Sequence, residues 1–135
     1  MTTAREIFTI AMAMIDGLDG RTGAAESADT RDYQFRAPPL LTQITAELSV
    51  YSDALGGEPV ASLDREFGDD YMARAVIPCA LASRLTADEN PSVSSHFERR
   101  YYDALSRYSG SKPQSFGSVA DVYGGLSSPG SGGAF

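Results

Sequence analysis

Cysteine and histidine are almost absent from this sequence, which has one of each among its 135 residues. Cys79 therefore has no partner for a disulfide within the chain, and its place in an apolar run indicates a buried, unreactive thiol. His96 alone cannot supply the two histidines that many zinc sites use, and one cysteine cannot build a thiolate cluster. We expect neither a metal ion nor a cofactor.

Patterns typical of catalysis are also lacking. Ser94 and Ser95 precede His96, but all three fall in a predicted helix and not on the strained turn that exposes a nucleophilic serine. The glycine-rich stretches lack the Gly-Lys-Ser/Thr of a phosphate-binding loop. Residues 16–23 lack the spaced oxygen ligands of a calcium-binding loop. The sequence therefore predicts a protein that is not an enzyme.

Basic residues are few: 11 stand against 18 acidic residues, which gives a net charge of −7. A negative chain repels a phosphate backbone, so tight or sequence-specific binding of nucleic acid is not expected. An acidic surface that nucleic acid slides past stays compatible with this charge. The N-terminus has no basic region followed by an apolar stretch, and no 18 apolar residues run together. These absences predict a soluble protein made in the cytoplasm.

Four helical patterns are present, and the first begins at Thr3. Thr3 and Glu6 have the spacing of a capping box, in which each side chain accepts a hydrogen bond from the other's backbone N–H. Apolar residues then follow one helical face as far as Leu18, and Phe8 and Met12 form a second stripe beside it. A small bundle would struggle to cover this second stripe, which makes Phe8 and Met12 candidates for a subunit interface.

The second pattern, from about residue 29 to residue 51, keeps one helical phase across Pro38 and Pro39. Because a break would reset the phase, we predict one long helix that is kinked where the two prolines remove N–H groups. Tyr33 and Tyr51 fall on its apolar face. The alternative is two helices, the second with proline in its first turn.

Residues 52–68 are predicted to form a loop, after which Asp69 caps a third helix that runs to about residue 88. This helix is apolar nearly all round, which is typical of the central helix of a bundle. Pro78 should bend it. The acidic pair Asp88-Glu89 at its end is interpreted as a solvated turn, with a contact or a weak ion site as the alternative.

The fourth helix has the clearest start, because Asn90 is a good cap and Pro91 suits the first helical position. Gly110 is the expected C-terminal cap. Tyr102 lies off the buried stripe and is a candidate contact residue, with an ordinary exposed tyrosine as the alternative. The predicted fold is all-α: residues 1–109 form a small four-helix bundle with proline-kinked helices.

Residues 110–135 contain seven glycines, six serines and two prolines, which is the composition of a flexible arm. Ordering this backbone costs roughly 25 to 50 kcal/mol, whereas burying one phenylalanine returns about 1.5 to 3 kcal/mol. Phe135 alone therefore cannot order the arm. A disordered linker is one interpretation; the other is an extended arm that several apolar residues anchor to a surface outside the bundle.

The combination of helix order and arm resembles the head-to-tail connector proteins of tailed bacteriophages, also called adaptors or head completion proteins. The resemblance covers about 105 residues and leaves the arm out. It rests on an Ala-rich central helix, an Asn-Pro break, and a last helix that carries Tyr-x-x-x-Leu-x-Arg from Tyr101 to Arg107. The stretches that carry it are residues 28–52, ADTRDYQFRAPPLLTQITAELSVYS, and residues 73–108, ARAVIPCALASRLTADENPSVSSHFERRYYDALSRY.

This resemblance implies a ring, usually of about twelve copies, below the portal protein at the neck of the virion. The portal protein, the stopper or tail protein and further copies of the chain would be its partners, with DNA only as passing cargo and no membrane. The alternatives are another neck component, such as a tail-completion protein, and a solitary helical interaction domain. The expected subunit-interface residues are Phe8, Met12 and Tyr102. The expected anchors of the arm on the portal or on neighbouring subunits are Phe116, Val119, Val122, Tyr123, Leu126 and Phe135.

Overall fold

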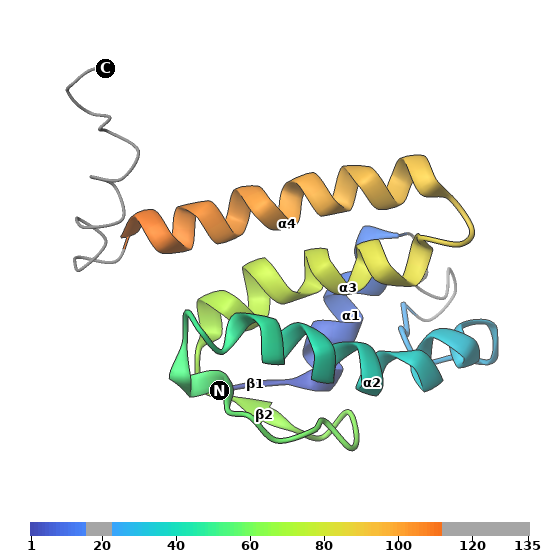
Figure 1. The fold of residues 1–135 in the computed structure, drawn as a ribbon. Coiled ribbons are helices and arrows are strands. Elements are labelled where there is room, and N and C mark those ends of the chain that lie inside the picture. Colours follow the sequence, from blue (N-terminus) through green and yellow to red (C-terminus); the bar gives the residue numbers. More distant parts are fainter. Residues whose placement is uncertain (16–22, 112–135) are drawn as a thin grey trace.

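A computed structural model describes residues 1–15 and 23–111, and this part of the chain is mostly helical, as predicted (Figure 1). No helix in this part is long and apolar enough to cross a membrane. The shorter elements are two 3₁₀ turns, Ala28–Thr30 and Asp53–Leu55, a π-helical turn, Met72–Val76, and the strands β1 (Thr2–Thr3) and β2 (Glu66–Phe67). The helices are α1 (Ala4–Met14), α2 (Arg31–Leu48), α3 (Ile77–Thr86) and α4 (Pro91–Ser111).

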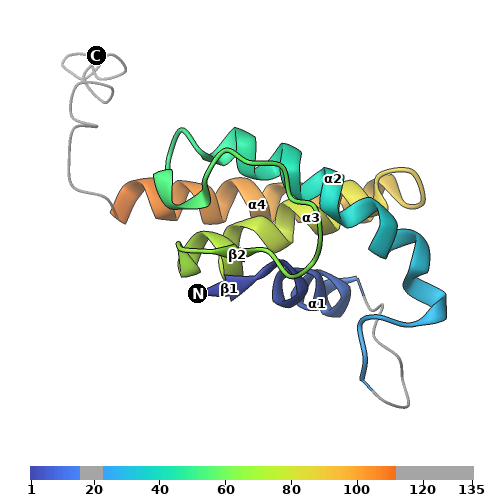
Figure 2. The same cartoon turned by 90° about the horizontal axis from the view of Figure 1, so that it is seen from below.

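The central position predicted for the third helix is confirmed. α1 and α2 pack against α3 from two sides and α4 packs against it from a third (Figures 1 and 2). Every residue of α3 except Arg84 is buried. A buried leucine such as Leu81 contributes about 1.5 to 3 kcal/mol through the removal of apolar surface from water, so α3 supplies much of the core.

The prediction that Phe8 and Met12 lie at a subunit interface is wrong. Both side chains have no exposed surface and belong to the hydrophobic core. The physical reason is that α1 contacts α2, α3 and the π-helical turn, and these elements together cover both of its apolar stripes. The bundle therefore buries a surface that the sequence pattern suggested would be left over.

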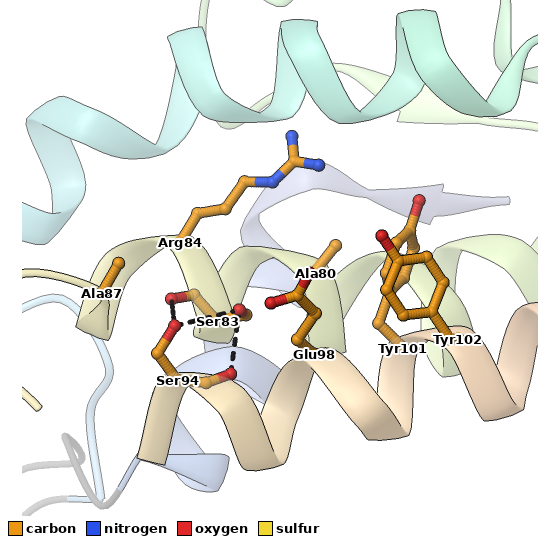
Figure 3. Close-up of a pocket in the computed structure, with 8 residues that line it drawn as sticks. All are labelled: Ala80, Ser83, Arg84, Ala87, Ser94, Glu98, Tyr101 and Tyr102. Carbon is orange, nitrogen blue, oxygen red and sulfur yellow. Dashed lines mark hydrogen bonds between the residues drawn. The ribbon is translucent and has the colours of Figure 1, made fainter. Parts of the chain in front are cut away.

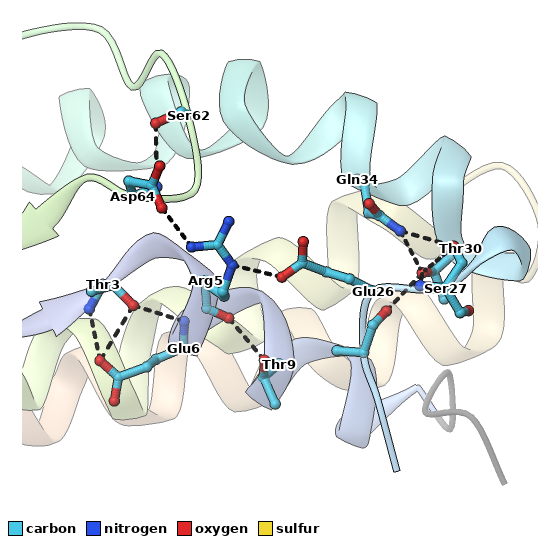
Figure 4. A network of polar contacts seen from close by, with 11 residues as sticks. Thr3, Arg5, Glu6, Thr9, Glu26, Ser27, Thr30, Gln34, Ser62 and Asp64 are labelled. Carbon is cyan, nitrogen blue, oxygen red and sulfur yellow. Dashed lines mark hydrogen bonds and ion pairs between the residues drawn. The ribbon is translucent and has the colours of Figure 1, made fainter. Parts of the chain in front are cut away.

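The N-terminus of α1 is held by polar contacts that join three segments (Figure 4). The capping box is confirmed: Glu6 N donates to Thr3 Oγ1 at 3.1 Å and Thr3 N donates to Glu6 Oε1 at 2.9 Å. In the same turn Arg5 donates to Asp64 at 2.6 Å and to Glu26 at 2.7 Å. Both hydrogen bonds raise the pKa of the guanidinium, and the bond to Asp64 has the larger effect. Arg5 thus joins α1 to the loop before β2 and to the segment before α2.

α2 is one helix with Pro38 and Pro39 inside it, so the single-helix prediction is confirmed and the two-helix alternative is wrong. The helix tolerates the prolines because the buried face continues across them, with Ala37 and Leu41 fully buried. Thr42 then links α2 to the following loop: its hydroxyl donates to the Pro38 carbonyl at 2.9 Å and accepts from the N–H of Val60 at 2.8 Å.

The entry to α3 is capped as predicted, since Asp69 Oδ1 accepts from the N–H of Met72 at 3.1 Å. The π-helical turn Met72–Val76 follows, and Pro78 stands near the start of α3. A proline at this position cannot donate to the carbonyl four residues before it. The wider π turn lies where that bond would have formed, and it separates the two parts of the helix.

α4 begins as predicted, with Asn90 Oδ1 accepting from the N–H of Val93 at 3.3 Å and Pro91 as the first helical residue. The predicted end is wrong. The helix continues through Gly110 to Ser111, so Gly110 belongs to its last turn and is not the residue after it. Glycine weakens a helix by only about 1 kcal/mol, which does not terminate a helix that is 21 residues long.

A two-stranded ribbon joins the N-terminus to the loop before α3, and the sequence pattern does not predict it. β1 and β2 are antiparallel, with Thr2 opposite Phe67 and Thr3 opposite Glu66. Beside the ribbon the Thr2 hydroxyl donates to Asp70 at 2.7 Å, and this bond lowers the pKa of the Asp70 carboxyl. The ribbon holds the N-terminus beside the start of the π-helical turn.

Candidate functional site

α4 lies on the bundle as a ridge. Its main contacts are with α3 and the π-helical turn, whereas α1 and α2 contact α3 and each other. The buried side chains of α4 form one stripe, Ser94, Phe97, Tyr101 and Tyr108, and most of its remaining residues are exposed. A helix supported along a single stripe leaves a groove on each side. One groove lies toward α2 and the other toward α1.

The groove toward α2 has a volume of about 200 Å³ and lies between α3 and α4 (Figure 3). Small residues of α3 form its floor, and α4 contributes one wall. Its lining residues are Ala80, Ser83, Arg84, Ala87, Ser94, Glu98, Tyr101 and Tyr102.

Arg84 ties the groove to α2. Its guanidinium donates to Gln43 Oε1 at 3.1 Å and to Glu47 Oε1 at 2.7 Å. A guanidinium held by two acceptors on a neighbouring helix is fixed in orientation. The edge of the groove is therefore rigid where α2 and α3 meet.

Tyr101 and Tyr102 form the aromatic wall, with ring centroids 5.1 Å apart. Tyr101 is buried, and desolvation, followed by the charge of Glu47, raises its pKa to about 12. Tyr102 is 58% exposed, as the prediction of a contact residue requires. Tyr51 is near enough to act on Tyr101 electrostatically and is 43% exposed, and the adjacent Val50 is 80% exposed. We call the two exposed tyrosines, Tyr51 and Tyr102, the aromatic patch.

The polar side chains of this groove make contacts between the helices. The hydroxyls of Ser83 and Ser94 both donate to backbone carbonyls between α3 and α4. His96 is not among the lining residues. In the part of the chain that the structure describes, no group of three or more His, Cys, Asp or Glu side chains could hold a metal ion. An exposed aromatic beside a rigid polar rim is the arrangement common in protein interfaces.

The predicted site residues have different outcomes. Tyr102 lies at the groove, whereas Phe8 and Met12 lie in the core. Tyr51, expected on the buried face of the second helix, is partly exposed because α2 ends at Leu48. The six arm residues, Phe116, Val119, Val122, Tyr123, Leu126 and Phe135, lie outside the described residues.

Two further predictions concern single side chains. Cys79 is a buried free cysteine, and burial raises the pKa of its thiol. Glu89, interpreted as part of a solvated turn, accepts a hydrogen bond from the hydroxyl of Tyr33 at 2.5 Å. The turn after α3 is therefore attached to the first turn of α2, a contact that spacing along the sequence could not reveal.

Comparison of the chain with models of protein families, with curated proteins and with solved structures finds no match.

Proposed function

We propose that this chain is a structural virion protein, a head-to-tail connector that forms a ring below the portal and joins the capsid to the tail. The proposal begins from the resemblance of residues 28–52 and 73–108 to that family. The observation that carries it furthest is the placement of α4, which packs on α3 along one stripe and leaves the aromatic patch exposed.

An exposed aromatic patch favours association. Tyrosine is enriched at protein interfaces, where a few such residues supply most of the binding energy. Tyr102 lines a groove whose edge is fixed by Arg84. In a ring, this patch would lie against the neighbouring copy, and the same contact would repeat around the ring.

The charge of the chain fits a channel through which DNA passes. A net charge of −7 per copy would give the ring a negative wall that repels the phosphate backbone. The arm has a separate role in this proposal, because its six apolar residues would dock on the portal or on neighbouring subunits. Weak docking of each arm suffices, because a closed ring presents all of its arms at once.

A deletion of residues 112–135 tests the role of the arm. This boundary keeps the whole described extent of α4, Pro91–Ser111. We expect the shortened protein to keep its helical circular dichroism and its cooperative unfolding, but to lose co-purification with the portal ring of the same virion. Unchanged attachment of the shortened protein would contradict the docking role.

The substitution Tyr102→Ala tests the interface independently of the arm. We expect it to weaken ring formation on the portal about tenfold, since tyrosine is enriched among the few interface residues whose truncation costs about 2 kcal/mol or more, while the free energy of unfolding of the monomer hardly changes. Arg99→Ala, an exposed change on α4 away from both grooves, is the matched control. If full-length protein and portal never form a ring, the connector proposal is wrong.

A further inference from the structure

The second groove beside α4, on the side of α1, differs from the first in both size and charge. It has a volume of about 330 Å³ and is bounded by α1, the π-helical turn, the start of α3 and the second half of α4. Its floor is apolar, with Ile10 and Met14 from α1 and Pro78 from α3. Four segments thus converge on one site.

Three arginines line this groove: Arg74 from the π-helical turn, and Arg100 and Arg107 from α4. Arg107 pairs with Asp103 of the same helix at 2.9 Å. Among the described residues, no carboxylate lies within ion-pair distance of Arg74 or Arg100. The charge of Arg74 does act on Asp70, whose carboxyl pKa is lowered by the Thr2 hydrogen bond first and by the charge of Arg74 in addition. With Asp103 as its one acidic residue, the lining carries two more positive than negative charges on a chain whose net charge is −7.

The spacing of the arginines restricts the shape of the occupant. Arg100 and Arg107 are seven residues apart, which places them on one face of α4 and about 10 Å apart along its axis. A polyproline II segment has three residues per turn and rises about 3.1 Å per residue, so carboxylates three residues apart lie on one face at about this distance. Between them the apolar floor has room for one aliphatic or aromatic side chain.

The walls of the groove are held in position by contacts between the π-helical turn and α4. Tyr71, at the entry to the turn, stacks on Tyr108 with ring centroids 5.8 Å apart, and its hydroxyl donates to the carbonyl of Ala104 at 3.3 Å. Because these contacts attach the turn to α4, Arg74 is held across the groove from the two arginines of α4. Such π turns recur at functional sites.

A protein segment fits these features better than a nucleic acid. A phosphate backbone would have to approach Asp103 within the groove and a strongly negative chain around it. An apolar floor offers nothing to a sugar-phosphate chain, whereas a peptide can present carboxylates to the guanidinium groups and an apolar side chain to the floor. The positive charge of the groove is local and complements the carboxylates of a peptide. The apolar floor adds specificity for a peptide that also carries an apolar side chain.

We propose that this groove is a docking site for an acidic segment of a partner protein, bound in the polyproline II conformation, in which an apolar residue stands between two carboxylates about three residues apart. The proposal does not depend on the connector ring, because it concerns a different side of α4 and a ligand of defined chemistry.

Fluorescence anisotropy of labelled peptides with the full-length chain tests it. The probe is the peptide GSELGESG, and the matched probes are GSQLGQSG, without the charges, and GSESGESG, without the apolar residue. We expect saturable binding of the first probe that weakens as the salt concentration rises, and binding at least about tenfold weaker for each matched probe.

Arg100→Ala should weaken binding of the first probe about tenfold, because it removes a charge-assisted contact. Arg99→Ala is the matched control: it removes the same charge from the adjacent exposed position, which does not line the groove, and should leave the affinity unchanged. Equal losses in both variants would show general electrostatic attraction and overturn the proposal. Absence of saturable binding, or equal binding of the uncharged probe, would overturn it as well.

Three competing occupants are separated by further measurements on the same proteins. A labelled oligothymidylate that binds more tightly than the peptide and is lost in Arg100→Ala would make the groove a phosphate site. Dimerisation that is lost in Arg100→Ala would assign the groove to a second copy. Strong probe binding only after deletion of residues 112–135 would assign it to the chain's own arm. Each of these outcomes overturns the partner-segment proposal.

Discussion

Ser83 of α3 and Ser94 of α4 are joined by two hydrogen bonds that run in opposite directions. The hydroxyl of Ser83 donates to the carbonyl of Ser94 at 3.0 Å, and the hydroxyl of Ser94 donates to the carbonyl of Ser83 at 2.7 Å (Figure 3). Both residues are buried. This pair attaches the first half of α4 to the central helix, and therefore holds the ridge that separates the two grooves.

Ser94→Ala should lower the free energy of unfolding by about 1 to 2 kcal/mol, because it removes a buried hydrogen bond between the two helices. Urea denaturation followed by circular dichroism measures the change. Ser95→Ala is the control, since Ser95 is exposed on the same turn and should cost less than about 0.5 kcal/mol. Equal stability of the two variants would show that the serine pair does not hold α4.

Asp69→Ala should lower the free energy of unfolding more than Ser94→Ala does, by about 2 to 4 kcal/mol. The substitution removes a helix cap and further hydrogen bonds together. Asp69 accepts from the N–H of Met72 at 3.1 Å and from the hydroxyls of Ser52 and Tyr108, each at 2.8 Å. It therefore joins the π-helical turn to the loop after α2 and to the end of α4. Thermal and urea unfolding measure the effect.

Tyr108→Phe separates these contributions. It removes the hydroxyl that donates to Asp69 and keeps the aromatic ring. We therefore expect the free energy of unfolding to fall by about 1 kcal/mol. Asp88→Ala, at an exposed position, is the control for removing a carboxylate. A loss in Tyr108→Phe as large as that in Asp69→Ala would mean that the cap contributes little.

Arg65→Ala should loosen the loop between α2 and β2 more than it lowers overall stability. The guanidinium donates to the carbonyls of Leu55 and Glu58, each at 3.2 Å, and lies 5.1 Å from the ring centroid of Phe67. Hydrogen exchange of the backbone amides near Gly56 should become faster.

Arg65→Lys should fail to restore slow exchange, because an ammonium group cannot reproduce the planar fork that reaches both carbonyls. Full protection in this variant would show that charge alone holds the loop. The exposed change Arg99→Ala should leave exchange in the loop as it is in the unaltered protein.

Tyr33 provides a prediction about alkaline pH. Its hydrogen bond to Glu89, followed by burial, raises its pKa to about 12 from 10.0. A group whose folded-state pKa is raised stabilises the fold fully below the unfolded value. The stability from Tyr33 is therefore complete below about pH 10 and is lost as the pH rises toward about 12.

Glu89→Ala should bring the pKa of Tyr33 back toward 10, while Tyr101, whose pKa is raised mainly by burial, should stay near 12. Titration of ring-labelled tyrosines by nuclear magnetic resonance resolves the two. Asp88→Ala should change neither value. An unchanged Tyr33 in Glu89→Ala would assign its shift to burial.

Local chemistry in the sequence was sufficient to place the starts of three helices. It was also sufficient to predict that α2 continues across its two prolines. Thr3, Asp69 and Asn90 cap their helices because a side chain and an N–H two or three residues away meet whatever surrounds them. The helical phase across Pro38 and Pro39 also survives in one helix, since a continuous buried face outweighs two missing hydrogen bonds.

Contacts between distant segments decided the rest. Phe8 and Met12 are buried because three other elements close around α1, and Tyr51 is partly exposed because α2 ends at Leu48. The β1–β2 ribbon, the Tyr33–Glu89 bond and the two grooves beside α4 likewise join residues far apart along the chain. Apolar periodicity identifies which face of a helix is buried, but only packing in three dimensions determines what covers that face and how much surface stays open to a partner.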